Sequence, residues 1–216
     1  MNFNNVFRWH YLFLLLLTLF AGPVGAAQKL LILGDSLSAG YQMPAKIAWP
    51  NLLNEKWQQA PEVINGSISG DTAAQGLARL PALLKQHQPT WVLIELGGND
   101  GLRGLPPQNI ASDLQKAIDT VKAAHAQPLL MQIRLPANYG RRYTEAFSAI
   151  YPELAKKNAI PLIPFFMEQV YVKPEWMQQD GIHPNPAAQP FIAGLVNNAL
   201  KPLVKHKLNG LPSPDR

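Results

Sequence analysis

Two short apolar runs that end abruptly in glycine and polar residues constrain the fold of this chain most. Residues 30–33 stop at the Gly-Asp-Ser cluster of residues 34–36, and residues 90–96 stop at the Gly-Gly-Asn-Asp cluster of residues 97–100. Residues 30–33 are unbroken in their apolar character, which is typical of a strand buried on both faces, as in a parallel sheet, and residues 90–96 (TWVLIEL) are the strongest strand pattern in the chain. Chains leave such strands at the carboxyl edge of the sheet, where α/β proteins place their ligands. We therefore expect both polar clusters to lie at one edge of a parallel sheet.

Strand patterns alternate with amphipathic helix patterns along the chain. Strands are expected over residues 30–33, 62–65, 90–96, 128–135 and 160–165, and helices over residues 45–57, 73–87, 108–125, 145–157 and 187–200. Pro81 is expected to bend the second of these helices and Pro152 to interrupt the fourth. The alternation predicts an α/β fold in one domain, a flavodoxin-like three-layer sandwich with a five-stranded parallel sheet and helices on both faces.

Residues 1–26 have the pattern of a secretory signal peptide. Arg8 supplies an early positive charge, residues 11–20 are almost wholly apolar, and residues 24–26 are small, which favours cleavage after Ala26. The apolar run is too short to span a bilayer comfortably, and no cysteine follows to carry a lipid. We expect residues 1–26 to be removed, and the mature chain to lie in the periplasm without a stable membrane anchor.

The formal net charge of +5 does not indicate a nucleic-acid-binding protein. Residues 27–200 hold nearly equal numbers of basic and acidic side chains, and the excess comes from Arg8 and from the basic residues after position 200. A nucleic-acid-binding domain carries its basic excess on one folded face. We interpret residues 201–216 as a basic, flexible tail that follows a domain over residues 27–200.

Four polar clusters contain the residue types of acyl-transfer chemistry: residues 34–36, 69–71, 98–100 and 180–183. The first three follow strands, and therefore lie at the same edge of a parallel sheet. Together the four supply a hydroxyl nucleophile, an imidazole base, an orienting carboxylate and donors for an oxyanion. Each cluster taken alone is equally consistent with ordinary turn residues or helix caps.

The four clusters read GDSLS, ISGDT, GGND and DGIHP, and in this order the chain resembles the GDSL lipase/esterase family, also called SGNH hydrolases. The resemblance covers essentially the whole mature domain and implies a serine esterase or thioesterase that needs no metal and no other cofactor. It implies that Ser36 is the nucleophile, His183 the base and Asp180 the residue that orients His183. It also implies oxyanion donors from the backbone N–H groups of Ser36 and Gly70 and from the side-chain amide of Asn99.

The resemblance further implies fatty acyl esters, acyl-CoA thioesters, lysophospholipids and aryl esters as substrates, and we expect a monomer. The loops around the expected site offer apolar side chains for an acyl chain: Leu102, Leu105, Leu135, Pro136 and Tyr139. Two alternatives stay open, a carbohydrate O-deacetylase on the same fold and a non-catalytic module that binds a flavin or a glycan on a flavodoxin-like sheet.

Residues 101–107 form a glycine- and proline-rich segment directly after Asn99 and Asp100. The glycines would permit backbone movement and the prolines would stiffen the exit, a composition suited to a hinged flap. A rigid surface turn explains the same composition.

Overall fold

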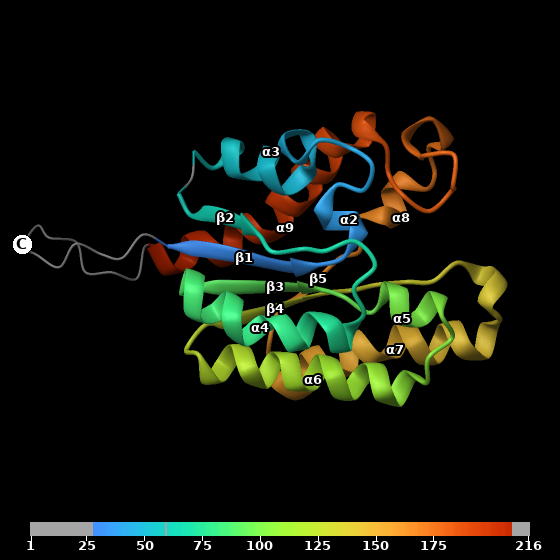
Figure 1. Cartoon of the computed structure of the whole chain (residues 1–216), viewed down its shortest axis with the longest axis horizontal. Helices are drawn as coiled ribbons and strands as arrows, with labels where there is room; N and C mark the ends of the chain where they lie inside the picture. The colour runs from blue at the N-terminus through green and yellow to red at the C-terminus, as the bar shows by residue number, and fades with distance from the viewer. Residues whose placement is uncertain (1–27, 59, 209–216) are drawn as a thin grey trace, which may run out of the picture.

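A five-stranded, all-parallel sheet lies at the centre of the computed structural model, which describes residues 28–58 and 60–208 (Figure 1). The strands are β1 (Lys29–Gly34), β2 (Glu62–Asn65), β3 (Trp91–Glu95), β4 (Gln127–Met131) and β5 (Leu162–Ile163). Their spatial order is β2-β1-β3-β4-β5, which is the flavodoxin-like order. This order confirms the predicted fold and places a topological switch point between β1 and β3, where doubly wound folds bind their ligands.

The neighbouring strands β1 and β3 are buried on both faces, as their largely apolar sequences predicted. The side chains of residues 30–33 in β1 and 91–94 in β3 have no exposed surface. In the register of this pair, Leu31 lies opposite Val92 and Gly34 lies opposite Glu95. The polar clusters that follow β1 and β3 therefore leave the sheet side by side.

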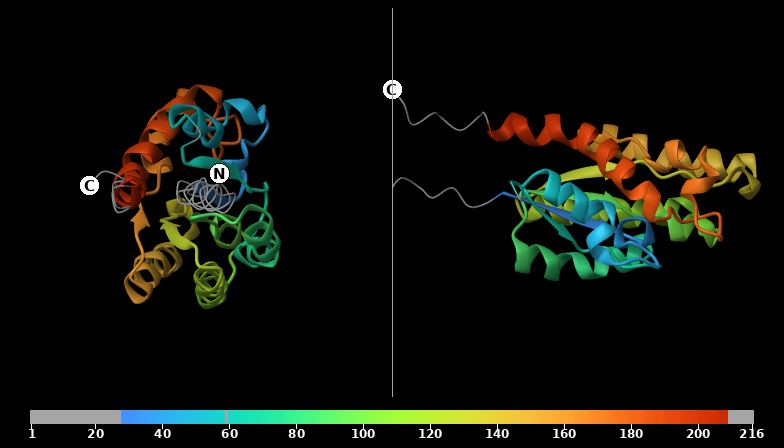
Figure 2. Two further views of the ribbon diagram at one scale, coloured as in Figure 1. Left: turned by 90° about the vertical axis from the view of Figure 1, so that its left-hand side faces the viewer. Right: turned by 90° about the horizontal axis from the view of Figure 1, so that it is seen from above.

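Helices cover both faces of the sheet (Figure 2). On one face lie α3 (Trp49–Lys56) and α9 (Gln189–Leu208), and on the other lie α4 (Ala73–His87), α6 (Pro107–Ala123) and α7 (Arg141–Asn158). Three short helices, α2 (Ser36–Ala39), α5 (Gly98–Leu102) and α8 (Met167–Val170), lie at the carboxyl end of the sheet (Figure 1). This arrangement confirms the predicted three layers.

The helix expected first, over residues 45–57, differs in the structure. A helical turn already begins at Ser36, because the Asp35 side chain accepts a hydrogen bond from the N–H of Leu37 at 3.0 Å and caps α2. The turn ends at Gly40, whose φ of 79° lies in the left-handed region. Residues 45–57 themselves divide into a 3₁₀ turn and α3, because Ala48 between them is extended.

The interruption expected at Pro152 is absent, and α7 runs through it. Proline has no N–H, so the carbonyl oxygen of Ser148 loses its usual partner in the helix. The side-chain amide of Gln132 donates to this oxygen at 3.2 Å. A side chain at the end of β4 thus compensates for the proline.

The last helix, α9, continues past the expected boundary at residue 200 as far as Leu208. Val204 follows Leu200 at a spacing of one helical turn, and both side chains are buried in the core. The expected tail over residues 201–216 therefore begins as helix.

Residues 209–216 and the expected signal peptide, residues 1–26, lie outside the described part of the chain. Within the described part, no helix is long and apolar enough to cross a membrane.

Candidate active site

Ser36, His183 and Asp180 form a continuous line of hydrogen bonds at the carboxyl end of the sheet. His183 Nε2 lies 2.8 Å from Ser36 Oγ, and His183 Nδ1 lies 2.7 Å from Asp180 Oδ2. Ser36 is the first residue of α2, directly after β1, whereas the other two residues belong to a loop that precedes α9. The structure therefore brings Ser36 together with a histidine that lies 147 positions further along the chain and with the aspartate beside that histidine.

The Asp180 carboxylate is fixed by its own loop. Its Oδ1 accepts hydrogen bonds from the N–H groups of Ile182 at 2.9 Å and His183 at 3.0 Å, across a turn in which Gly181 has a φ of 66°. Partial burial favours the neutral acid, but these bonds and the contact with the His183 ring outweigh it and lower the pKa of Asp180 to about 2. The carboxylate is therefore ionised at neutral pH and keeps the proton on His183 Nδ1, which leaves Nε2 free to accept a proton from Ser36.

The expected donors to an oxyanion are the backbone N–H groups of Ser36 and Gly70 and the side-chain amide of Asn99; Ser36 and Asn99 line a common cavity, whereas Gly70 is not among its lining residues. The N–H groups of Ser36 and Gly70 donate to no acceptor within the described part of the chain. Gly70 has a φ of 86°, which favours glycine at this position. The Asn99 side chain donates to Asp35 Oδ2 at 3.2 Å and to the carbonyl oxygen of Asp71, the residue after Gly70, at 3.0 Å.

A cavity of about 240 Å³ opens beside this line of residues. Its polar side chains include Asp35, Ser36, Asn99, Arg134 and His183. The rest of the wall is mainly apolar and includes Leu37, Leu102, Ile133, Leu135, Pro136, Phe165, Tyr171 and Ile182. A cavity that combines the Ser36 hydroxyl with mainly apolar walls suits an ester of an acyl chain.

The five apolar residues singled out in the sequence do not all reach this cavity. Leu102, Leu135 and Pro136 line it, whereas Leu105 and Tyr139 are not among its lining residues. The Leu105 side chain is exposed, and Tyr139 donates from its hydroxyl to the carbonyl oxygen of Leu102 at 3.2 Å.

The segment of residues 101–107 is not a loop throughout, because Gly101 and Leu102 end helix α5. A Cβ atom at Gly101 would lie only 2.7 Å from side-chain atoms of Leu135 and Phe147. This glycine therefore permits close packing and is poorly placed to act as a hinge, which favours the rigid interpretation for the start of the segment.

Asp35, the residue before Ser36, and Glu95 carry buried carboxyl groups to which the sequence patterns assigned no role in the site. Glu95 at the end of β3 is fully buried, and its Oε2 accepts hydrogen bonds from the Ser38 hydroxyl at 2.6 Å and the Asp35 N–H at 3.4 Å. Burial raises the pKa of Asp35 to about 7 and raises that of Glu95 well above its ordinary value. The sequence signal was a glutamate in the otherwise apolar run of residues 90–96, with nothing to indicate its partners.

Glu95→Gln is expected to change how stability depends on pH. Folded wild type keeps the Glu95 proton in a pH range where the unfolded chain has lost it. The contribution of Glu95 to the free energy of unfolding therefore falls as the pH rises above about 4.3. Glutamine is neutral at every pH and removes this contribution. The melting temperature of the variant relative to wild type should therefore increase as the pH rises from about 4.3 toward the raised pKa of Glu95. A constant difference in melting temperature would contradict a neutral Glu95.

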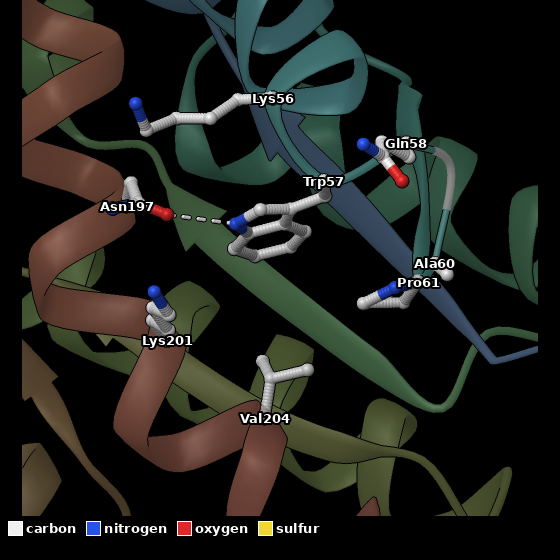
Figure 3. A pocket seen from close by; sticks show the side chains of 8 residues that line it. All are labelled: Lys56, Trp57, Gln58, Ala60, Pro61, Asn197, Lys201 and Val204. Atoms are coloured by element: carbon white, nitrogen blue, oxygen red, sulfur yellow. Dashed lines mark hydrogen bonds between the residues drawn. The ribbon is translucent and has the colours of Figure 1, made fainter.

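A larger cavity, of about 430 Å³, lies at the other end of the molecule, next to the residues that precede β2 (Figure 3). The Trp57 ring lies at its centre and donates from its indole N–H to Asn197 Oδ1 at 2.8 Å, with Lys56 and Lys201 nearby. None of its described lining residues carries a hydroxyl, an imidazole or a carboxyl group. The smaller cavity at Ser36 is therefore the candidate active site.

A flavodoxin-like sheet with a hydrogen-bonded serine, histidine and aspartate at its carboxyl edge defines a serine hydrolase. The model of the GDSL-like lipase/acylhydrolase family matches residues 32–189, and the chain belongs to this family. The resemblance stated from the four sequence clusters is thereby confirmed. The chain is accordingly an enzyme that hydrolyses ester bonds.

Named relatives extend over almost the whole chain. The thioesterase 1/protease 1/lysophospholipase L1 of Escherichia coli strain K12 is 69% identical over 208 residues, which cover 95% of this chain and 99% of that protein. An arylesterase of Vibrio mimicus is 57% identical over 84% of this chain and 90% of its own length. Among solved structures, the psychrotrophic esterase EstA of Pseudoalteromonas, inhibited by monoethylphosphonate, has a TM-score of 0.79 and 40% identity over 82% of this chain and 99% of that one.

Proposed function

We propose that this enzyme hydrolyses fatty acyl esters and thioesters, including acyl-CoA, lysophospholipids and aryl esters, through an acyl-enzyme on Ser36. The observation that carries the proposal is the 2.8 Å contact between Ser36 Oγ and His183 Nε2 beside an apolar cavity. In this proposal Asp180 orients His183, and the N–H groups of Ser36 and Gly70 and the amide of Asn99 bind the oxyanion.

The first half of the reaction forms the acyl-enzyme. Ser36 Oγ attacks the acyl carbon while its proton passes to His183 Nε2, and the carbonyl oxygen becomes an oxyanion. The imidazolium, whose Nδ1–H is bonded to Asp180, then gives the proton to the leaving alkoxide or thiolate as its bond to the acyl carbon breaks. The products are the free alcohol or thiol and the ester of Ser36.

The second half repeats the same proton transfers with water. His183 Nε2 takes a proton from a water molecule as its oxygen attacks the acyl carbon of the ester. Collapse of the tetrahedral intermediate releases the carboxylic acid, and the proton returns from His183 to Ser36 Oγ.

An acyl chain suits the cavity better than a sugar does, which favours the esterase over a carbohydrate O-deacetylase. More of the residues that line the cavity are aliphatic or aromatic than polar, and of the polar ones Ser36, Asn99 and His183 already have roles in the proposed reaction. The names of the relatives, which are esterases and a thioesterase, support the same substrate class.

A series of p-nitrophenyl esters of increasing chain length tests the substrate class. Leu102→Ser removes an apolar side chain from the cavity, so kcat/KM for long-chain esters should fall about tenfold while that for the acetate changes less than about threefold. Leu105→Ser is the matched control, because Leu105 lies in the same segment but outside the cavity lining. Equal losses across all chain lengths, or a wild-type preference for acetylated sugars, would contradict the proposal.

Asn99→Ala is expected to lower kcat by roughly 10²–10³-fold, the usual cost of removing one oxyanion donor. KM should change little, since the amide gains most once negative charge develops on the substrate oxygen. Steady-state kinetics on a single ester separate the two effects. A variant that raises only KM would mean that Asn99 binds the ground state of the substrate.

The proposed location is the periplasm, reached by export and cleavage after Ala26. The pattern of residues 1–26 supports this location. We also propose that the enzyme acts as a monomer without a stable membrane anchor, because one chain supplies all residues of the proposed site.

A further inference from the structure

The Tyr41 ring stacks on the imidazole of His183. The ring centroids are 4.2 Å apart and the ring planes meet at 30°. Tyr41 is not among the residues that line the catalytic cavity, and it therefore contacts the base without contacting the space for the substrate. Nothing in the sequence clusters indicated this pair, because Tyr41 and His183 belong to segments at opposite ends of the chain.

Backbone and side-chain hydrogen bonds fix both partners of the stack. The N–H of Tyr41 donates to the carbonyl oxygen of Ser36 at 3.3 Å, just beyond the left-handed Gly40 that ends α2. The side-chain amide of Gln178 donates to the carbonyl oxygen of Tyr41 at 3.0 Å, and its backbone N–H donates to the carbonyl oxygen of His183 at 2.8 Å. Gln178 thus ties the loop of the base to the segment that carries Ser36 and Tyr41.

We propose that Tyr41 is a positioning residue for His183, an inference that rests on the proposed function. Its ring holds the imidazole in line with Ser36 Oγ and Asp180, and its π face stabilises the imidazolium that forms when His183 takes the serine proton. The His183 side chain is only 16% exposed, so water contributes little to stabilising that charge. An aromatic face at this distance is worth more there than at an exposed site.

Several other groups contact His183 or share its cavity, and substitutions at Tyr41 leave these residues in place. Asp180 contacts Nδ1 from the same loop, and Ser36 contacts Nε2 from α2. Asp35, Arg134 and Tyr171 line the same cavity as His183. Because these groups are common to every variant below, a difference between the variants reports on the ring of Tyr41.

Three variants separate the aromatic face from other roles. Tyr41→Leu covers His183 without a π face, Tyr41→Phe keeps the face and loses the hydroxyl, and Gln42→Asn removes the 3.2 Å contact from the Gln42 amide to that hydroxyl. For Tyr41→Leu we expect kcat on a p-nitrophenyl ester to fall about tenfold with KM within twofold of wild type. Tyr41→Phe and Gln42→Asn should keep kcat within about threefold.

The pH profile of kcat/KM gives a readout that a merely structural role would not change. The π face of Tyr41 stabilises the imidazolium form of His183. Without that face, the imidazolium is expected to lose its proton at a lower pH. The midpoint of the acidic limb should therefore move to lower pH by about half a unit or more in Tyr41→Leu and stay in place in Tyr41→Phe. Thermal unfolding establishes that the variants are folded, and Tyr41→Met replaces Tyr41→Leu if the latter is not.

The proposal is overturned if Tyr41→Leu keeps the wild-type kcat or pH profile. It is also overturned if Tyr41→Phe loses as much activity as Tyr41→Leu, or if the loss appears in KM alone. Labelling of wild type with a fluorophosphonate distinguishes these failures from failure of the proposed function: an adduct on Ser36 together with a normal Tyr41→Leu variant removes only the role of Tyr41.

Discussion

Replacement of Ser36 by alanine is expected to abolish ester hydrolysis and to leave the fold unchanged. The hydroxyl that forms the acyl-enzyme is lost, and loss of such a nucleophile lowers kcat by about 10⁴-fold or more. The helical turn at this position does not depend on the hydroxyl, because Asp35 caps it through the N–H of Leu37. Hydrolysis of a p-nitrophenyl ester and the thermal unfolding curve measure the two parts of the prediction.

Ser112→Ala is the control for this substitution, since Ser112 is an exposed serine on α6 that is not among the residues lining the candidate site. It should behave as wild type in both measurements. Residual turnover of Ser36→Ala within tenfold of wild type would remove Ser36 as the nucleophile.

Asp180→Asn is expected to lower kcat by several orders of magnitude, about 10⁴-fold by analogy with other serine hydrolases. The ionised carboxylate accepts the Nδ1 proton of His183, whereas an amide can present its NH₂ group and favour the tautomer with the proton on Nε2. In that tautomer His183 cannot accept the proton of Ser36. Rates of the folded variant at neutral pH measure the effect.

The pH dependence of thermal stability provides a second check on the contacts of Asp180. Its pKa of about 2 in the folded state lies below the ordinary value, so its stabilising contacts are present above about pH 4 and are lost as pH falls toward 2. Near-normal rates of Asp180→Asn at neutral pH would mean that Ser36 and His183 work as a dyad.

The sheet and the place of the site could be predicted because both depend on local patterns. The largely apolar runs at residues 30–33 and 90–96 predicted burial of β1 and β3 on both faces, and parallel strands have their carboxyl ends at one edge. The placement of the clusters around Ser36 and Asn99 at the same edge follows from that geometry alone. The convergence of Asp180 and His183 with them was indicated by the family resemblance, because a loop without a preceding strand has no fixed place in such an argument.

Contacts between loops could not be predicted. The stack of Tyr41 on His183 depends on the left-handed turn at Gly40 and on the hydrogen bonds of Gln178, and neither leaves a periodic signal. The partners of Glu95 follow from the register of β1 against β3, which the sequence does not specify. The apolar character of Leu105 was visible in the sequence, but not that its side chain is exposed outside the cavity.

Covalent labelling tests the central claim, that Ser36 is the nucleophile, most directly. The enzyme is treated with a fluorophosphonate, the adduct is counted by intact mass, and the modified residue is located by peptide mass spectrometry while ester hydrolysis is followed. We predict one adduct per chain, on Ser36, that forms in step with the loss of activity and is absent from Ser36→Ala. Complete inactivation with the adduct on another residue, or with Ser36 unmodified, would contradict the account.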